Sequence, residues 1–316
     1  MTAAGAPAPD IPAAGAAVID SHQHFWDLSA HDQPWLASDP VLAPLMRNFA
    51  LADLAPLAAA EGVTATVVVQ TVAESWETPE LLSLAAGVGG VGGPDVAGGP
   101  ALVAGVVGWA DLTAPDIADV LAELRGLPGG ERLSGIRHPV LVEPDPDWLA
   151  RPAVLRGLKA LAAAGLAYDV VGEPRHLPAA VTAARQVPEL RFVLDHLGNP
   201  DMQPGASPGA SEPWASAFAQ FAALENTTAK LSGILGVPSP LGAPPGTLTH
   251  MRSYYDLALH AFGPNRLMFG SDWPPCTLEA TYAQVCAAAR ALTADLSEPE
   301  RAAVFSGTAR RAYRLP

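Results

Sequence analysis

Eight short apolar runs, rich in β-branched residues, alternate with eight alanine- and leucine-rich stretches of helical pattern along almost the whole chain. The expected strands are residues 18–25, 63–72, 101–110, 133–140, 166–172, 190–197, 228–235 and 266–272. The expected helices are residues 50–61, 78–87, 115–126, 151–164, 176–186, 213–225, 251–262, 279–293 and a last one at 297–312. Continuous runs such as Thr66-Val-Val-Val-Gln70 are typical of strands buried on both faces of a parallel sheet. This alternation predicts an α/β fold, a (β/α)8 TIM barrel.

The same alternation would also suit an open, doubly wound sheet. However, no Gly-x-Gly-x-x-Gly follows the first strand, as a dinucleotide-binding sheet of that kind would require. We therefore expect a single barrel domain over residues 18–316, preceded by a flexible tail rich in alanine, proline and glycine at 1–17. Three segments rich in glycine and proline, at 87–99, 199–213 and 236–247, are expected to be loops.

Charge and composition restrict the partners. The net charge is −14 and lysine occurs only at Lys159 and Lys230, which argues against a nucleic-acid partner or an anionic membrane surface. No apolar run is long enough to span a bilayer. Two cysteines without metal-type spacing favour a reduced, cytoplasmic protein. We expect a small-molecule substrate. Homodimers are common among such barrels, although no residue of the sequence marks an interface.

The first strand ends in Asp20-Ser-His22-Gln-His24, and side chains at positions i and i+2 of a strand point to the same face. Two imidazoles at the carboxyl end of a barrel strand suit metal binding or water activation, whereas alone they could equally be a buried, hydrogen-bonded pair. Other polar residues stand at the remaining strand ends. They are Gln70, Trp109, Asp111, Arg137, His138, Tyr168, Asp169, Asp195, His196, Lys230, Ser232, Ser271 and Asp272.

These segments together resemble the amidohydrolase superfamily, and within it the lactonase-like group that acts on sugar lactones. The segments that carry the resemblance are Ile19-Asp-Ser-His-Gln-His-Phe-Trp-Asp27, Val69-Gln70, Gly105-Val-Val-Gly-Trp-Ala-Asp-Leu112, Gly135-Ile-Arg-His138, Phe192-Val-Leu-Asp-His-Leu-Gly-Asn-Pro200, Lys230-Leu-Ser-Gly233 and Phe262-Gly-Pro-Asn-Arg-Leu-Met-Phe-Gly-Ser-Asp-Trp-Pro274. The resemblance extends from Val18 to the last expected helix.

The resemblance implies a catalytic set of His22, His24, His196 and Asp272, with Asp272 as the general base that deprotonates the attacking water. The same four residues would hold one divalent cation, zinc, if a metal is used; some relatives in the group need none. Binuclear members carry a lysine or glutamate on the fourth strand, which is absent from Gly135-Ile-Arg-His138, so two metals are not expected.

Substrate contacts are expected from the residues around this set. Arg137 and His138 match a segment that contacts substrate, although they face opposite sides of one strand and only one of them can point inward. Gln70, Trp109 and Tyr168 are expected as pocket walls by position alone. Asp195 is expected to orient the backbone or His196, pointing away from that histidine, and Lys230 is expected to be a structural ion-pair partner.

The implied activity is the opening of a lactone, a sugar aldonolactone in particular, to its hydroxy acid during carbohydrate breakdown. The alternative with the same barrel is a metal-dependent decarboxylase of an aromatic or muconate-type acid. An inactive barrel kept as a binding protein is a third hypothesis. A nucleophilic Ser271 is disfavoured because no Gly-x-Ser-x-Gly surrounds it.

Overall fold

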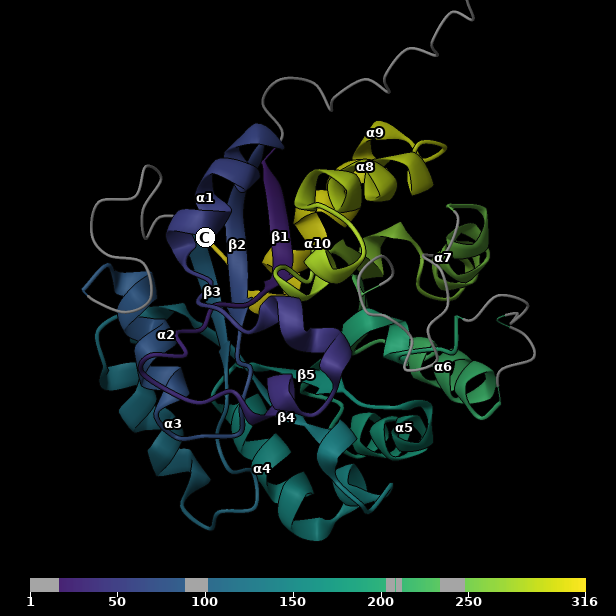
Figure 1. The fold of residues 1–316 in the computed structure, drawn as a ribbon. Helices are drawn as coiled ribbons and strands as arrows, with labels where there is room; N and C mark the ends of the chain where they lie inside the picture. The colour runs from purple at the N-terminus through teal and green to yellow at the C-terminus, as the bar shows by residue number, and fades with distance from the viewer. Residues whose placement is uncertain (1–16, 89–101, 203–207, 209–211, 234–247) are drawn as a thin grey trace, which may run out of the picture.

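The computed structural model describes residues 17–88, 102–202, 208, 212–233 and 248–316. In that part of the chain, strands alternate with helices as the sequence predicts, and the eight strands form one parallel sheet in the order β1 to β8. The strands are β1 Val18–Gln23, β2 Val63–Val69, β3 Val103–Gly108, β4 Leu133–Pro139, β5 Ala167–Val171, β6 Arg191–Leu194, β7 Thr227–Leu231 and β8 Leu267–Phe269. The (β/α)8 barrel is confirmed, with the strands inside and the helices around them (Figure 1).

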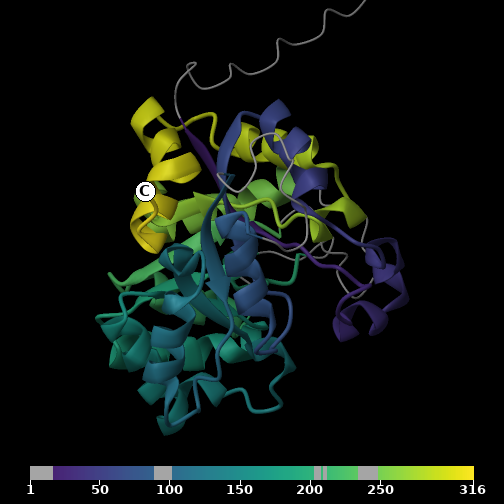
Figure 2. The same cartoon turned by 90° about the vertical axis from the view of Figure 1, so that its left-hand side faces the viewer.

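The helices follow the strands in sequence and cover the outside of the sheet (Figures 1 and 2). They are α1 Leu51–Ala60, α2 Glu77–Ala86, α3 Ile117–Gly126, α4 Pro152–Ala163, α5 Leu177–Gln186, α6 Trp214–Ala222, α7 Leu248–Phe262, α8 Tyr282–Leu292, α9 Glu298–Ala302 and α10 Thr308–Tyr313. A π-helical turn at Ala303–Gly307 joins α9 to α10, so the single helix expected at 297–312 is one continuous but irregular helix. None of the helices in the described residues combines the length and apolar character that a membrane crossing requires.

The barrel closes where β1 meets β8. The Asp272 amide donates to the His22 carbonyl at 2.8 Å, and the His24 amide donates to the Trp273 carbonyl at 2.7 Å. The Ser21 hydroxyl adds a bond of 2.6 Å to the Phe269 carbonyl. Asp272 and Trp273, which follow β8, therefore take the place of a strand extension against β1. We call this junction of β1 with β8 and residues 271–273 the seam.

The barrel interior is layered. Inside the barrel, Val67, Val107, Val193 and their neighbours form an apolar cluster with residues of α10, so the last helix packs against this part of the interior. Above this cluster, toward the carboxyl ends, the inward-facing side chains become polar and charged. Because parallel barrels place their functional groups at the carboxyl end, this polar layer is where a site is expected.

The expected loops at 87–99, 199–213 and 236–247 lie largely or wholly outside the described residues, and the expected tail at 1–17 does so except for Ala17. Strands β6 and β8 are shorter than the expected 190–197 and 266–272. The reason lies in the backbone, since His196 and Asp272 have φ of 53° and 58° and so leave the extended conformation. Both are predicted catalytic residues, and both stand on a left-handed turn rather than on a strand.

Candidate active site

His22 and His24 converge at the carboxyl end of β1, as their spacing predicts. Their Nε2 atoms lie 3.1 Å apart, and the residues are 0% and 5% exposed. The His24 Nδ1 lies 2.7 Å from the Val69 carbonyl, which can only accept a hydrogen bond. The His24 proton is therefore on Nδ1, and its Nε2 presents a lone pair to the interior.

Asp272 completes a three-residue cluster with these histidines. Its Oδ1 lies 3.5 Å from Nε2 of His22 and 3.4 Å from Nε2 of His24. The seam hydrogen bond from the Asp272 amide to the His22 carbonyl fixes the backbone on which this carboxylate is carried. A positive φ at a non-glycine residue is uncommon and occurs often at functional sites, so the strained turn is consistent with a role for this carboxylate.

The His196 ring lies against the His22 ring, with centroids 4.6 Å apart. Its Nδ1 is 2.9 Å from the Ser232 hydroxyl, which follows β7. A Cβ at Gly233 would come within 2.7 Å of this Nδ1, and Gly233 also has φ of 67°. The chain therefore needs glycine at 233 to let the imidazole reach His22. All four predicted catalytic residues are brought together.

Electrostatics in the cluster favour a carboxylate beside uncharged imidazoles. Burial lowers the pKa of His24, and it lowers that of His22 well below the usual range. Burial alone would raise the pKa of Asp272, but His196, His24 and His22 outweigh it and bring the pKa to about 2. At neutral pH, Asp272 is therefore ionised while the Nε2 lone pair of His24 is available.

The cluster has the geometry of a cation site. In tetrahedral zinc coordination with bonds of about 2.0–2.1 Å, neighbouring ligand atoms lie about 3.3 Å apart. The corresponding separations here are 3.1, 3.4 and 3.5 Å. Two nitrogens and one carboxylate oxygen are also a common donor set for zinc. The residues therefore fit a single zinc ion. His22 also belongs to a second potential ligand group, with Asp195 and His196.

Arg137 points into the barrel from β4, where its guanidinium is held by protein groups. Its Nη1 lies 3.0 Å from Asp195 Oδ2, and its Nη2 donates to the Gln70 carbonyl. The Gln70 side chain donates back to the Arg137 carbonyl at 3.1 Å. Arg137 and Gln70, two of the predicted substrate contacts, are thus buried and bonded to each other, and Arg137 Nη1 lies 3.5 Å from Nε2 of His22.

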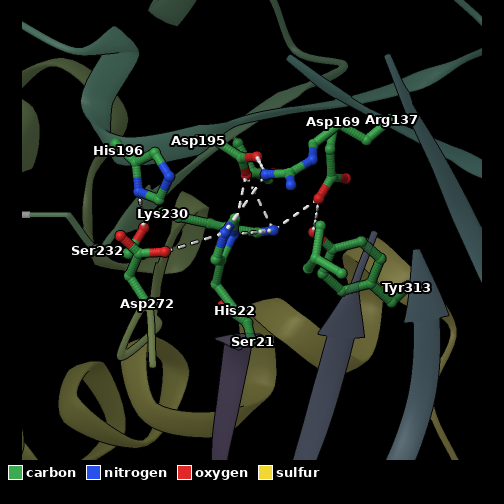
Figure 3. A network of polar contacts seen from close by, with 12 residues as sticks. Ser21, His22, Arg137, Asp169, Asp195, His196, Lys230, Ser232, Asp272 and Tyr313 are labelled. Atoms are coloured by element: carbon green, nitrogen blue, oxygen red, sulfur yellow. Dashed lines mark hydrogen bonds and ion pairs between the residues drawn. The ribbon is translucent and has the colours of Figure 1, made fainter. Parts of the chain in front are cut away.

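Three further charged residues of the interior were not given a site role from the sequence (Figure 3). Lys230, Asp169 and Asp195 are all 0% exposed, and the Lys230 ammonium lies 2.6 Å from Asp169 Oδ2 and 3.0 Å from Asp195 Oδ1. The ion-pair role expected of Lys230 is confirmed. Asp195 does not point away from the histidines, because the chain leaves β6 at Leu194; its Oδ1 lies 3.4 Å from Nδ1 of His22. A lone lysine in a buried apolar strand was the sequence signal for this network.

His138 and Trp109 form a separate group beside the barrel mouth. The Trp109 indole donates to His138 Nδ1 at 3.1 Å, so His138 carries its proton on Nε2, 2.9 Å from Glu143. The imidazole also stacks on Trp148, with centroids 4.1 Å apart. As expected, Arg137 and His138 face opposite sides of β4, and Arg137 is the inward one.

Tyr168 corrects the sequence analysis. It is fully buried between the sheet and the helices, with its ring 6.1 Å from that of Phe192. Because side chains alternate along β5, the inward positions belong to Ala167 and Asp169, which places Tyr168 in the outer layer. The structure does not bring its side chain to the site, so it is not a pocket wall.

The sequence matches the amidohydrolase family over residues 19–315. The chain belongs to this family. It is 38% identical over 306 residues to an L-fucono-1,5-lactonase of Burkholderia multivorans, covering 96% of this chain and 97% of the relative. A second L-fucono-1,5-lactonase, from Burkholderia ambifaria, is 35% identical over 301 residues, covering 94% and 95%. The crystal structure of a zinc-bound amidohydrolase from Burkholderia multivorans superposes with a TM-score of 0.83 at 36% identity, covering 95% of this chain and 100% of the other.

Proposed function

We propose that the protein hydrolyses the lactone of a sugar acid, and that 1,5-lactones of deoxy sugar acids such as L-fuconate are the first class to test. The proposal depends on one observation above all. A carboxylate held ionised, Asp272, lies within 3.5 Å of two imidazole nitrogens at the carboxyl end of the barrel. The two L-fucono-1,5-lactonases that resemble this chain along nearly its full length support the substrate class.

The chemistry requires a water proton to be removed, an oxyanion to be stabilised and the ring oxygen to leave. The Asp272 carboxylate takes the proton as the water oxygen attacks the lactone carbonyl carbon. The negative charge that develops on the carbonyl oxygen is stabilised by His22 and His196. The carbon–oxygen bond of the ring then breaks, and the proton passes from Asp272 to the departing alkoxide, which leaves the open hydroxy acid.

A zinc ion would be held by His22, His24 and Asp272, whereas His196 belongs to the other potential ligand group, with His22 and Asp195. Such an ion, when bound, polarises the carbonyl and lowers the pKa of a water molecule. Without it, the N–H groups of His22 and His196 would provide the electrophilic side of the site, because the His24 proton is on Nδ1 and donates to the Val69 carbonyl. The same four residues carry the reaction in both cases.

The test is a pH-indicator assay on a panel of 1,4- and 1,5-aldonolactones, with metal-free and zinc-loaded protein side by side. Asp272→Asn should lower kcat/KM about 10²- to 10⁴-fold, the usual range for general-base catalysis. Asp119→Asn, an exposed carboxylate on α3, is the matched control and should leave the rate unchanged.

Two outcomes would refute the proposal. One is lactone hydrolysis that survives in Asp272→Asn. The other is release of carbon dioxide from an aromatic or muconate-type acid in the absence of lactone hydrolysis, which would establish the decarboxylase alternative. The Arg137 guanidinium, which could have bound a substrate carboxylate, is already bonded to Asp195 and to the Gln70 carbonyl.

A further inference from the structure

The side chain of Lys230 lies on the face of His22 opposite to the Asp272 cluster. Its Nζ is 3.0 Å from Nδ1 of His22, 2.6 Å from Asp169 Oδ2 and 3.0 Å from Asp195 Oδ1 (Figure 3). Tyr313 of α10 donates a further hydrogen bond of 2.7 Å to the same Asp169 oxygen. The ammonium is 0% exposed and is surrounded by protein groups, so it cannot contact a substrate in this arrangement.

The contact with Lys230 determines which nitrogen of His22 carries the proton. An ammonium group is a hydrogen-bond donor only, so a contact of 3.0 Å requires a lone pair on Nδ1. The single proton of the imidazole must then be on Nε2. Nε2 of His24 is an acceptor, because Nδ1 of that residue donates to the Val69 carbonyl. The 3.1 Å contact between the two Nε2 atoms is therefore a hydrogen bond from His22 to His24.

Donors and acceptors match along the series from Lys230 through His22 and His24 to the carbonyl of Val69. The Arg137 Nη1 lies 3.5 Å from Nε2 of His22, but it has its shorter contact, of 3.0 Å, with Asp195 Oδ2. A divalent ion at His22, His24 and Asp272 would need the opposite tautomer, with a lone pair on Nε2 of His22. Histidines that bind metals usually donate their other N–H to a carboxylate or carbonyl. Asp195 Oδ1, 3.4 Å from Nδ1, could accept that proton, but the same oxygen is already paired with the Lys230 ammonium at 3.0 Å. Lys230 occupies the position between them.

We propose that Lys230 is a positioning residue that acts as a built-in cation on the Nδ1 side of His22. It holds His22 in the Nε2–H tautomer, weakens divalent-metal binding at the His22, His24 and Asp272 group, and prevents a second ion from using His22 with Asp195 and His196. The chain can thus keep a complete hydrogen-bonded site without a metal, and it binds at most one zinc ion. This inference does not depend on which lactone is the substrate.

The first experiment uses the wild-type protein. Histidine labelled with ¹⁵N gives imidazole nitrogen shifts that distinguish a protonated from an unprotonated nitrogen, and the spectrum of His22→Gln identifies the His22 signals. In the metal-free protein, Nδ1 of His22 should be unprotonated. One equivalent of zinc should move the proton to Nδ1. A metal-free His22 that carries its proton on Nδ1 would overturn the proposal.

The second experiment measures zinc affinity by competition with a chromophoric chelator. Removing Lys230 alone leaves two buried carboxylates with too little compensation, so the variant is the charge-balanced pair Lys230→Met with Asp169→Asn. Its zinc affinity should rise about 10- to 100-fold, the range seen when groups behind metal-binding histidines are changed. Asp169→Asn alone keeps the ammonium and should gain nothing.

The chain offers a matched control in Lys159, its second lysine, which is exposed on α4. Lys159→Met should bind zinc as the wild type does. Metal analysis at excess zinc should give no more than one ion per wild-type chain. Unchanged or weaker zinc binding in the charge-balanced pair, with a native circular dichroism spectrum, would refute the inference, as would two ions bound by the wild type.

Discussion

A single methyl group at Gly270 should disturb the site more than most side-chain deletions. Gly270 follows β8 at the seam, and its amide donates to the Leu231 carbonyl at 3.3 Å. A Cβ built there would lie 2.8 Å from the His22 Cβ, 3.3 Å from the His22 nitrogen and 3.3 Å from the Ser232 Cβ. The nearest two of these atoms belong to the rigid part of His22, so no rotation of a flexible side chain can relieve the overlap.

The size of the effect follows from these distances. Nonbonded carbon atoms are at their optimum at about 3.5–4.0 Å, so Gly270→Ala must move His22 by roughly 1 Å. Inserting a methyl group into a packed interior costs about 1–3 kcal/mol of unfolding free energy. A catalytic group displaced by about 1 Å can cost about 10²-fold in rate. We therefore expect a modest loss of stability and a much larger loss of kcat/KM.

The assay combines urea denaturation with lactone hydrolysis and zinc titration on the same preparations. Gly126→Ala is the control, because a Cβ at Gly126 meets nothing within 4 Å and the residue ends helix α3. It should be neutral or slightly stabilising. If Gly270→Ala kept activity and zinc affinity within twofold of the wild type, the argument that close packing at the seam positions His22 would be wrong.

Three other predictions follow from buried groups near the site. Burial raises the pKa of Glu77 to about 7, so between about pH 4.5 and 7 the folded protein holds a proton that the unfolded chain has released. The free energy of unfolding should therefore fall as pH rises from 4.5 to 8, by up to about 3 kcal/mol more in the wild type than in Glu77→Gln. If urea denaturation gave the same pH dependence of unfolding free energy for both proteins, this prediction would be wrong. Ser232→Ala removes the hydroxyl partner of His196 and should lower kcat/KM about 10-fold, whereas the exposed Ser216→Ala should not; unchanged kinetics would refute the positioning role. Zinc should slow hydrogen exchange at the seam amides of His24 and Asp272 more than at the Phe192 amide, which bonds to the Asn226 carbonyl; equal slowing would mean that the ion stabilises the barrel only as a whole.

The barrel could be predicted from the sequence because its strands are buried on both faces and read as continuous apolar runs. β2 illustrates this, since the run that includes Val67, Val68 and Val69 is fully buried in the structure. The seam could not be predicted in the same way. Residues 271–273 bond to β1 from left-handed and irregular backbone, and no local pattern in the sequence encodes such a conformation.

In the candidate site, too, some residues could be predicted from local sequence and others could not. The i, i+2 spacing of His22 and His24 and the strand-end position of Asp272 were enough to predict that these side chains meet. The placement of Tyr168 was wrong because a residue near the end of a strand can face either side, and alternation along β5 gives the inward place to Asp169. The Lys230 network was underestimated because its partners come from β5 and from the residue after β6, which only the closed barrel brings together.

Two aspartates are buried at the seam, and their surroundings explain why only one suits the chemistry. Asp20 accepts hydrogen bonds from the Ser271 amide, the His22 amide and the Tyr282 hydroxyl, all neutral groups, and burial raises its pKa to about 6. Asp272 is buried to a similar degree, but the imidazoles around it outweigh burial and hold its pKa at about 2. The Asp20 carboxyl therefore fixes the backbone of the seam, and its oxygens are already occupied by hydrogen bonds from protein groups. The Asp272 carboxylate, in contrast, keeps a full negative charge that faces the histidines. A cation or a proton taken from water can compensate that charge, so the metal-bound and metal-free forms of the site would use the same carboxylate.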